Sequence, residues 1–232
     1  MNPISTSALA LVVALATAPA GAAALFSEDF EGYGVTPGNF LVRTGVDMTP
    51  RWSIYDPFGG AGSVDVVSST FNGSFPALGG ASLDLNGTAG PGFSSQGAIA
   101  TTLTGMTPGQ EYILEFQYSG NFNNEPANKR FAVGFQNASL TFSNGIGPGQ
   151  NEFETSQPAF QAGTMRFTAT ANTVDVRFNT LLQNTQGGAV LDNIAVAAVP
   201  EAHEWAMMLA GLGLVGWVAR RRSRTGGDAA FA

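Results

Sequence analysis

The sequence predicts an all-β protein, and more narrowly an antiparallel β-sandwich of jelly-roll type. Short segments alternate apolar and polar residues, as strands with one buried face do. Glycine, proline, serine and asparagine separate these segments, and the 30 glycines and 12 prolines supply the turns. Before the C-terminus no segment keeps the 3.6-residue apolar period of a helix. No unit of about 20 to 50 residues repeats, so a solenoid is excluded.

The first half of the predicted sandwich contains six short strands. The segment SVDVVS illustrates the pattern, because Val64 and Val66 share one face while Asp65 lies on the other. The turn residues Asp56-Pro57 and Gly59-Gly60 end the strand before it. The six predicted strands are 25–31, 40–43, 52–55, 63–68, 81–85 and 98–103.

The second half contains the clearest strand, 111–119, which has the sequence EYILEFQYS. Its odd and even positions separate an aromatic, apolar face from a face with two glutamates, as expected of a half-buried antiparallel strand. Residues 144–157 are predicted to be a polar loop, and 165–178 a hairpin that turns at 170–172. The other predicted strands are 131–135, 140–142, 165–169, 174–178 and 189–196.

The N-terminus reads as a secretory signal. Residues 8–18 form an apolar run, and Ala22-Ala23-Ala24 fits an A-x-A cleavage site. We therefore predict a signal peptide at 1–24, a mature start at Leu25 and a sandwich domain over 25–198.

The C-terminus combines an apolar run with a basic cluster. Residues 205–219 carry no charge, and as a helix they would span roughly 22 Å, against about 30 Å of hydrocarbon in a bilayer. Arg220, Arg221, Arg222 and Arg224 follow at once and would stay on the cytoplasmic side. We predict a transmembrane helix at 205–219 and a disordered tail at 225–232; the alternative is a buried terminal helix of a globular domain.

The order of these C-terminal parts resembles the PEP-CTERM sorting signal of Gram-negative bacteria. Ala202 stands where that signal usually has a second proline. The resemblance covers 199–224 and implies an exosortase-type membrane protease as partner, a stay at the inner membrane before cleavage, and delivery to the cell surface or matrix. The matching residues are Val199, Pro200, Glu201, Trp205, Arg220, Arg221 and Arg222.

A second resemblance covers roughly residues 62–196. The succession GSVDVV, GGASLDLNGT, GAIATTL, TGMTPGQEYILEFQYSGN and GGAVLDNIAV is similar to bacterial choice-of-anchor domains. It is more distantly similar to the galactose-binding-like sandwiches of cell-wall-associated proteins. The resemblance implies a secreted jelly-roll domain and identifies no catalytic residue.

Composition excludes several functions. Residues 25–199 hold six Lys and Arg against fourteen Asp and Glu, which argues against nucleic acid as a partner. The chain has no cysteine, and its only histidine, His203, lies in the sorting motif, so the domain has no histidine for a catalytic triad or a zinc site. Glu111 and Glu115 share a strand face about 13 Å apart, beyond glycosidase spacing. We therefore predict that the protein is not an enzyme.

Acidic residues near both ends of the domain suggest a structural calcium site. The first and last strands of a jelly roll commonly lie together, and carboxylates are the oxygen ligands that calcium takes. The alternative is that these residues are solvated at a strand edge. The candidate ligands are Glu28, Asp29, Glu31 and Asp192, completed by backbone carbonyls.

Aromatic residues beside amides and carboxylates suggest a sugar-binding face. Trp52 is the best single candidate, and the alternative for each aromatic is that it fills the core. The candidates are Trp52, Tyr55, Asp56, Tyr118 and Asn121.

The sequence thus predicts an exported, non-catalytic surface or matrix protein that adheres to exopolysaccharide or the cell envelope. Two alternatives stay open: a self-assembling matrix component without a glycan ligand, and an enzyme acting on polysaccharide.

Overall fold

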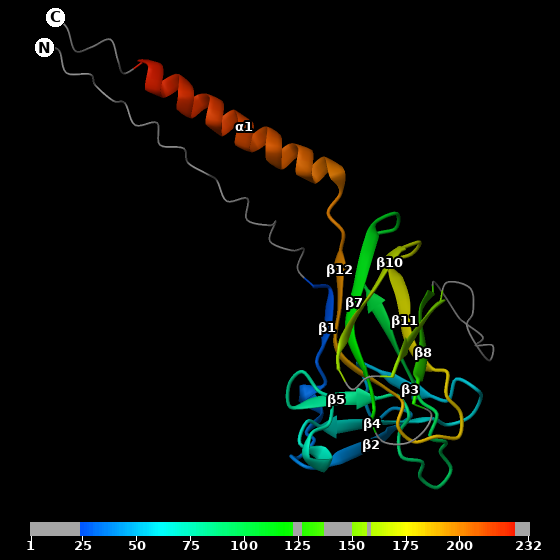
Figure 1. Cartoon of the computed structure of the whole chain (residues 1–232). Coiled ribbons are helices and arrows are strands. Elements are labelled where there is room, and N and C mark those ends of the chain that lie inside the picture. The colour runs from blue at the N-terminus through cyan, green and yellow to red at the C-terminus, as the bar shows by residue number, and fades with distance from the viewer. Residues whose placement is uncertain (1–23, 123–126, 137–149, 157–158, 226–232) are drawn as a thin grey trace, which may run out of the picture.

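Strands in two antiparallel sheets carry the fold of the computed structural model, which describes residues 24–122, 127–136, 150–156 and 159–225 (Figure 1). Two short 3-10 helices, η1 (Glu31–Tyr33) and η2 (Phe71–Gly73), and one C-terminal helix, α1 (Ala202–Thr225), complete it. The strands are β1 (Phe26–Glu28), β2 (Phe40–Thr44), β3 (Ser53–Tyr55), β4 (Ser63–Ser68), β5 (Ala81–Asp84), β6 (Ala98–Thr104), β7 (Glu111–Gly120), β8 (Lys129–Gln136), β9 (Gln150–Thr155), β10 (Gln161–Thr168), β11 (Thr173–Thr180) and β12 (Ala189–Ala198).

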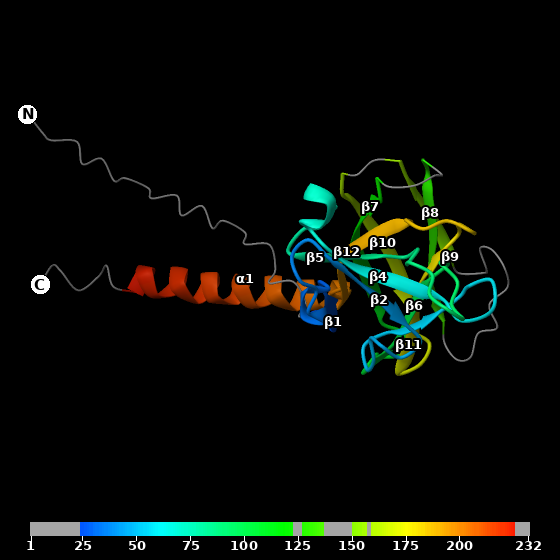
Figure 2. The same cartoon turned by 90° about the horizontal axis from the view of Figure 1, so that it is seen from below.

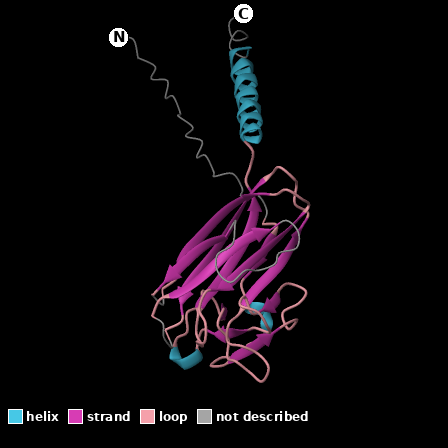
Figure 3. Ribbon diagram, turned by 90° about the vertical axis from the view of Figure 1, so that its right-hand side faces the viewer, coloured by secondary structure: helices cyan, strands magenta, loops and turns pink. Residues whose placement is uncertain are grey.

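The two sheets face each other as a sandwich (Figure 3). One sheet has the order β10-β7-β12-β5-β4-β2, with β1 added beside β12, and the other has the order β3-β6-β11-β8-β9. Successive strands often change sheet, as β2, β3 and β4 do, and as β10, β11 and β12 do. Such crossing between sheets is typical of a jelly roll, so the predicted all-β sandwich is confirmed.

Aromatic rings fill the space between the sheets. The alternation on β7 turns Phe116 inward, as predicted, where its ring centroid lies 6.0 Å from Phe131, 5.0 Å from Phe153 and 5.3 Å from Phe178. These partners come from β8, β9 and β11 of the facing sheet. Edge-to-face pairs of this kind add to the gain from area burial, which suits a chain without disulfides.

Two predicted elements differ from the structure. The predicted hairpin at 165–178 is wrong, because β10 pairs with β7 while β11 pairs with β6 and β8 in the other sheet. The predicted loop at 144–157 is wrong over β9, which pairs with β8 at the sheet edge. An edge strand can be mostly polar, and Phe153, the single apolar residue of β9, packs against the core. The predicted strand at 140–142 lies outside the described residues.

Helix α1 follows β12 after the three residues 199–201 and leads away from the sandwich, also when the molecule is seen from below (Figure 2). A helix over 205–219 is therefore confirmed. Within the described residues, however, no helix has the combined length and apolarity that crossing a membrane requires, so the predicted transmembrane segment is corrected. Its uncharged run has 15 residues, including three glycines, where a span needs about 20 apolar residues. The predicted signal segment, up to residue 23, and the tail from 226 are outside the described part.

Candidate functional site

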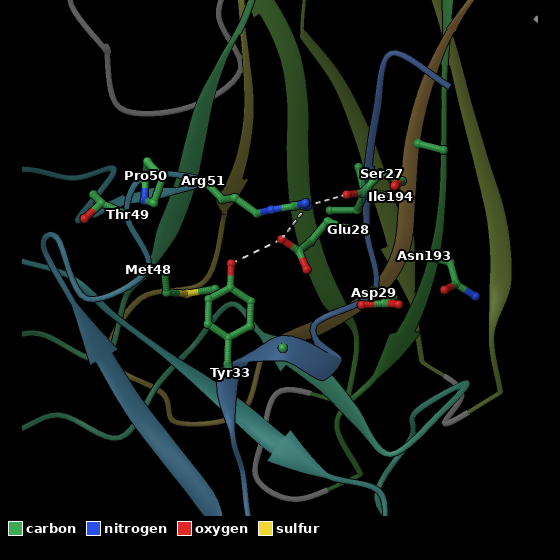
Figure 4. Close-up of a pocket in the computed structure, with 12 residues that line it drawn as sticks. Ser27, Glu28, Asp29, Tyr33, Met48, Thr49, Pro50, Arg51, Asn193 and Ile194 are labelled. Atoms are coloured by element: carbon green, nitrogen blue, oxygen red, sulfur yellow. Dashed lines mark hydrogen bonds and ion pairs between the residues drawn. The ribbon is translucent and has the colours of Figure 1, made fainter. Parts of the chain in front are cut away.

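A cleft of about 640 Å³ opens where the first and last strands of the sandwich meet. Strand β12 pairs with β5 through Val190 and Leu191, and with β1 through residues 194–196. A β-bulge between Asp192 and Ala195 separates these two pairings. The bulge bends the strand locally, and the cleft, here called the β1–β12 cleft, lies beside it. Its lining comes from β1, η1, the turn 48–51 and β12 (Figure 4).

Glu28 of β1 lies buried in the wall of this cleft. Its Oε1 accepts a hydrogen bond from the Phe30 amide at 2.9 Å, and its Oε2 accepts from the Tyr33 hydroxyl and the Trp52 indole N–H, both at 3.1 Å. A buried carboxylate is tolerated only when donors replace its water, and here three do so. Glu28 is therefore a fixed negative group that holds β1, η1 and the segment before β3 together.

Arg51 lies at the rim of the cleft with its guanidinium fixed from two sides. Its Nη1 donates to the Ser27 carbonyl at 2.5 Å and lies 3.5 Å from Oε2 of Glu28, as Figure 4 shows. The Phe26 ring centroid is 5.8 Å from its Cζ, close enough for a cation–π contact. The side chain is still 54% exposed. A positioned cation thus faces solvent beside a buried carboxylate.

Three further polar groups complete the cleft. Burial and the neighbouring negative charge of Glu28 raise the pKa of Tyr33, which keeps its hydroxyl protonated as a donor. Asn193 follows the bulge in the left-handed backbone region, with φ of 47°, and is exposed. Asp29 is exposed on the same side (Figure 4). A guanidinium, an amide, a carboxylate and an aromatic ring side by side suit a ligand rich in hydroxyl groups.

The predicted calcium ligands do not meet as one group. Glu28 faces the cleft donors described above, whereas Glu31 reaches the β5 side, where its Oε1 accepts from the amides of Gly80 at 2.6 Å and Ala81 at 3.1 Å. Asp192 accepts from the Leu78 amide at 2.7 Å. Among the described residues no cluster of three or more Asp, Glu, His or Cys side chains could hold a metal. The four predicted carboxylates therefore do not form one cluster, and backbone amides of residues 78–81 donate to two of them, Glu31 and Asp192.

Negative charge is nevertheless concentrated at this end of β12. Burial first, and then the charges of Glu31 and Asp29, raise the pKa of Asp192 to about 6. Asp29 itself accepts a hydrogen bond from the Glu31 amide at 3.2 Å. Glu31 and Asp192 are therefore close enough for their charges to interact, although each also accepts hydrogen bonds from backbone amides of residues 78–81.

Two of the predicted sugar-binding aromatics are core residues, which corrects the prediction for them. Trp52 is 1% exposed and packs edge-to-face on Phe26 at 5.4 Å and Phe178 at 6.2 Å. Tyr118 is 8% exposed and packs on Phe131 at 5.3 Å. Both lie between the sheets, so neither offers a free ring face to a sugar.

Of the other three predicted residues, Tyr55 and Asp56 are consecutive at the end of β3, whereas Asn121 lies beside the other sheet. The Tyr55 hydroxyl donates to Oδ1 of Asn179 at 2.5 Å on the five-stranded sheet, and burial raises its pKa. Asp56 accepts from the Phe58 amide and thereby fixes the turn after β3. Asn121 donates to Asp84 beside the seven-stranded sheet. The structure therefore does not assemble the predicted set into one site.

The cleft residues Tyr33, Arg51 and Asn193 were missed by sequence reasoning. Arg51 had one signal, since it is one of only six cationic residues in an acidic domain. Tyr33 and Asn193 had none, because 160 residues separate them and only the pairing of β1 with β12 brings them together.

Comparisons with known proteins do not identify the chain. No protein-family model and no curated protein matches it. Among solved structures, it is similar to a xylan-binding domain from CBM 22, with 16% identity, a TM-score of 0.45, and coverage of 78% of this chain and 97% of that one. The CBM22-1 xylan-binding domain of Paenibacillus barcinonensis Xyn10C is 13% identical with a TM-score of 0.43, and the match covers 78% of this chain and 98% of that one. A family 35 carbohydrate binding module from Clostridium thermocellum is 15% identical with a TM-score of 0.38, and the match covers 68% of this chain and 97% of that one. Likenesses this weak assign neither ligand nor residue roles.

Proposed function

We propose that this chain is an exported, non-catalytic surface or extracellular-matrix protein whose sandwich associates with carbohydrate. The observation that carries the proposal is the β1–β12 cleft, where Arg51, Asn193, Asp29 and the Tyr33 ring line one open space. Sugars are bound through hydrogen bonds to hydroxyl groups and through apolar contact with aromatic rings. The cleft offers both on a rigid pair of strands.

The bonding of Glu28 favours binding over hydrolysis. A general acid or nucleophile needs a carboxylate oxygen that can reach the substrate. Both oxygens of Glu28 already accept from Phe30, Tyr33 and Trp52. Glu28 therefore supports the cleft rather than acting on a ligand.

The test is retention of the full-length chain on a glycan array and on immobilised exopolysaccharides. Arg51→Ala should reduce retention at least about tenfold, the effect of losing one charged hydrogen-bonding group. Arg166→Ala is a matched control, because Arg166 is also 54% exposed and also pairs with a glutamate, Glu111. Failure of every polymer to retain the chain, or full retention of the Arg51 variant alongside the control, would contradict the proposal.

We also propose that the C-terminal segment is a sorting signal read by an exosortase-type protease at the inner membrane. The accessibility of the motif supports this. Val199 is still tied to the sandwich, since its amide donates to the Glu111 carbonyl at 2.9 Å, whereas Pro200 and Glu201 are exposed before α1 begins at Ala202. Mass spectrometry of the exported product should find a C-terminus near Pro200–Glu201. A product that keeps residues 205–224 would contradict it.

Self-assembly into a matrix is the second candidate function. Helix α1 favours it, because Met207, Leu212 and Trp217 are each more than half exposed. Exposed apolar surface of this kind commonly marks an interaction site. Light scattering of the full chain should then show a mass that rises with concentration, while glycan retention is absent.

A bound calcium ion is a separate proposal, with Glu31 and Asp192 as its proposed ligands. The raised pKa of Asp192 supports it, since a cation would relieve the repulsion from Glu31 and Asp29. Native mass spectrometry with about 1 mM calcium, a level at which extracellular modules bind, should show one bound ion that Asp192→Asn removes. Exposed Asp47 provides the control Asp47→Asn, which should keep the ion.

A further inference from the structure

Two buried aspartates face each other on neighbouring strands, and neither lines the β1–β12 cleft. Asp65 of β4 lies directly opposite Asp84 of β5 in the antiparallel register. Val64, Val66 and Leu83 beside them point into the core, so both aspartates lie on the outer face of the seven-stranded sheet. They are nevertheless only 7% and 2% exposed.

Asp84 accepts hydrogen bonds from three separate parts of the chain. Its Oδ1 accepts from the amides of Asn86 at 2.9 Å and Gly188 at 2.7 Å, and its Oδ2 accepts from Nδ2 of Asn121 at 2.6 Å. The turn after β5, the segment before β12 and the end of β7 are thereby fixed to one carboxyl group.

Asp65 is only half satisfied. Its Oδ2 accepts from the amide and the hydroxyl of Thr88, both at 2.9 Å. Its Oδ1 is buried and has no hydrogen-bond partner among the described residues. A buried, ionised oxygen without a donor is costly, by about 1–3 kcal/mol or more. Something must supply the missing hydrogen bond.

No cation in the described structure offers that bond. The strands that flank the pair present Val42 of β2 opposite Asp65 and Val190 of β12 opposite Asp84. The loops present the neutral groups named above. The charged side chain that acts on Asp84 is Asp65 itself; burial, and then this charge, raise the pKa of Asp84 to about 7, and burial raises that of Asp65.

We propose that Asp65 and Asp84 together bind one proton at neutral pH, and that this shared proton makes the stability of the loops bonded to them depend on pH. Directly opposed residues have Cβ atoms about 4.5–5.5 Å apart, within reach of a hydrogen bond between two carboxyl groups. The proton makes one carboxyl the donor that Asp65 Oδ1 lacks. Losing it leaves two buried negative charges side by side. Their burial and mutual repulsion then destabilise the strands and the loops bonded to them, even though each donor bonds an ionised oxygen more strongly.

The sign of the pH effect follows from linkage. A carboxyl whose pKa is higher in the folded than in the unfolded state stabilises the fold at low pH, and this stabilisation is lost as the pH rises through the folded value. For Asp84 the window runs from 3.8 to about 7. The folding equilibrium constant should fall by up to about tenfold per pH unit within it.

Urea unfolding of the full-length chain between pH 4 and 8 tests this, with Asp65→Asn as the variant. The amide of the variant replaces the proton as donor to Asp84, so the variant should become more stable than wild type by up to about tenfold per pH unit as the pH rises. Asp192 also has a raised pKa. It is present in both proteins, so its effect cancels in the ratio of the folding equilibrium constants of variant and wild type. The control Asp47→Asn changes an exposed aspartate that accepts from the amide and the hydroxyl of Thr44. This variant should differ from wild type by the same amount at every pH.

A second measurement does not depend on any variant. Carboxyl carbon NMR of the wild-type chain should show one of the two aspartates titrating near pH 7, together with a loss of amide protection at Gly188 and Thr88 over the same range. Both carboxyls titrating below pH 5, or a ratio of stabilities independent of pH, would overturn the proposal.

Discussion

At the scale of single residues, carboxylates fix parts of the chain that are distant in sequence. Glu28 joins η1 to the segment before β3, and Asp192 and Glu31 both hold the loop 78–81. In each case a side chain distant in sequence replaces water for backbone or indole N–H groups. Removing Glu28 would leave the Phe30 amide and the Trp52 indole N–H buried and unsatisfied, which is where large losses of stability arise.

Glu28→Gln should lower the free energy of unfolding by about 2–4 kcal/mol, because its amide nitrogen would face the donors from Tyr33 and Trp52 or that from Phe30. Urea unfolding measures this. Glu111→Gln is the control, since Glu111 pairs with Arg166 on the surface and should change stability by less than about 1 kcal/mol. Equal stability of the two variants would show that the Glu28 network contributes little.

At the scale of elements, the close approach of strands depends on small residues. Gly163 of β10 lies opposite Phe116 of β7, and a Cβ at position 163 would overlap the Phe116 ring. That ring is the centre of the aromatic core, in contact with Phe131 and Phe178. The glycine therefore decides how tightly β10 closes the edge of the sheet.

Gly163→Ala should lower stability by about 1–3 kcal/mol, the range for overpacking a core. Thermal unfolding of the full chain measures the loss. Gly90→Ala is the control, because a Cβ there meets nothing within 4 Å and the backbone is not left-handed. If the two variants melt alike, Phe116 has room to move and the packing argument fails.

At the scale of the whole molecule, the sandwich and the C-terminal helix are joined by a short exposed linker. β12 is an interior strand of the seven-stranded sheet, whereas the apolar side chains described on α1 are exposed. The stability of the sandwich should therefore not depend on the helix.

A chain that ends at Glu201 should unfold within about 0.5 kcal/mol of the full chain, as expected when exposed groups are removed. Ending the chain at Asp192 instead removes the half of β12 that pairs with β1, and should prevent cooperative unfolding. Circular dichroism during thermal unfolding distinguishes these results. A large loss in the longer truncation would mean that α1 packs on the sandwich.

The sequence by itself determined the strand pattern, the inward face of β7, the helix after Pro200 and the acidic, histidine-free character of the domain. These follow from local alternation, turn residues and composition, which the chain carries at every position. Only the tertiary structure decided that Trp52 and Tyr118 fill the core, that β10 and β11 lie in different sheets, and that Tyr33, Arg51 and Asn193 share a cleft. The physical reason is that sheet pairing and the bulge in β12 are long-range interactions, so the residues they bring together have no fixed spacing along the chain.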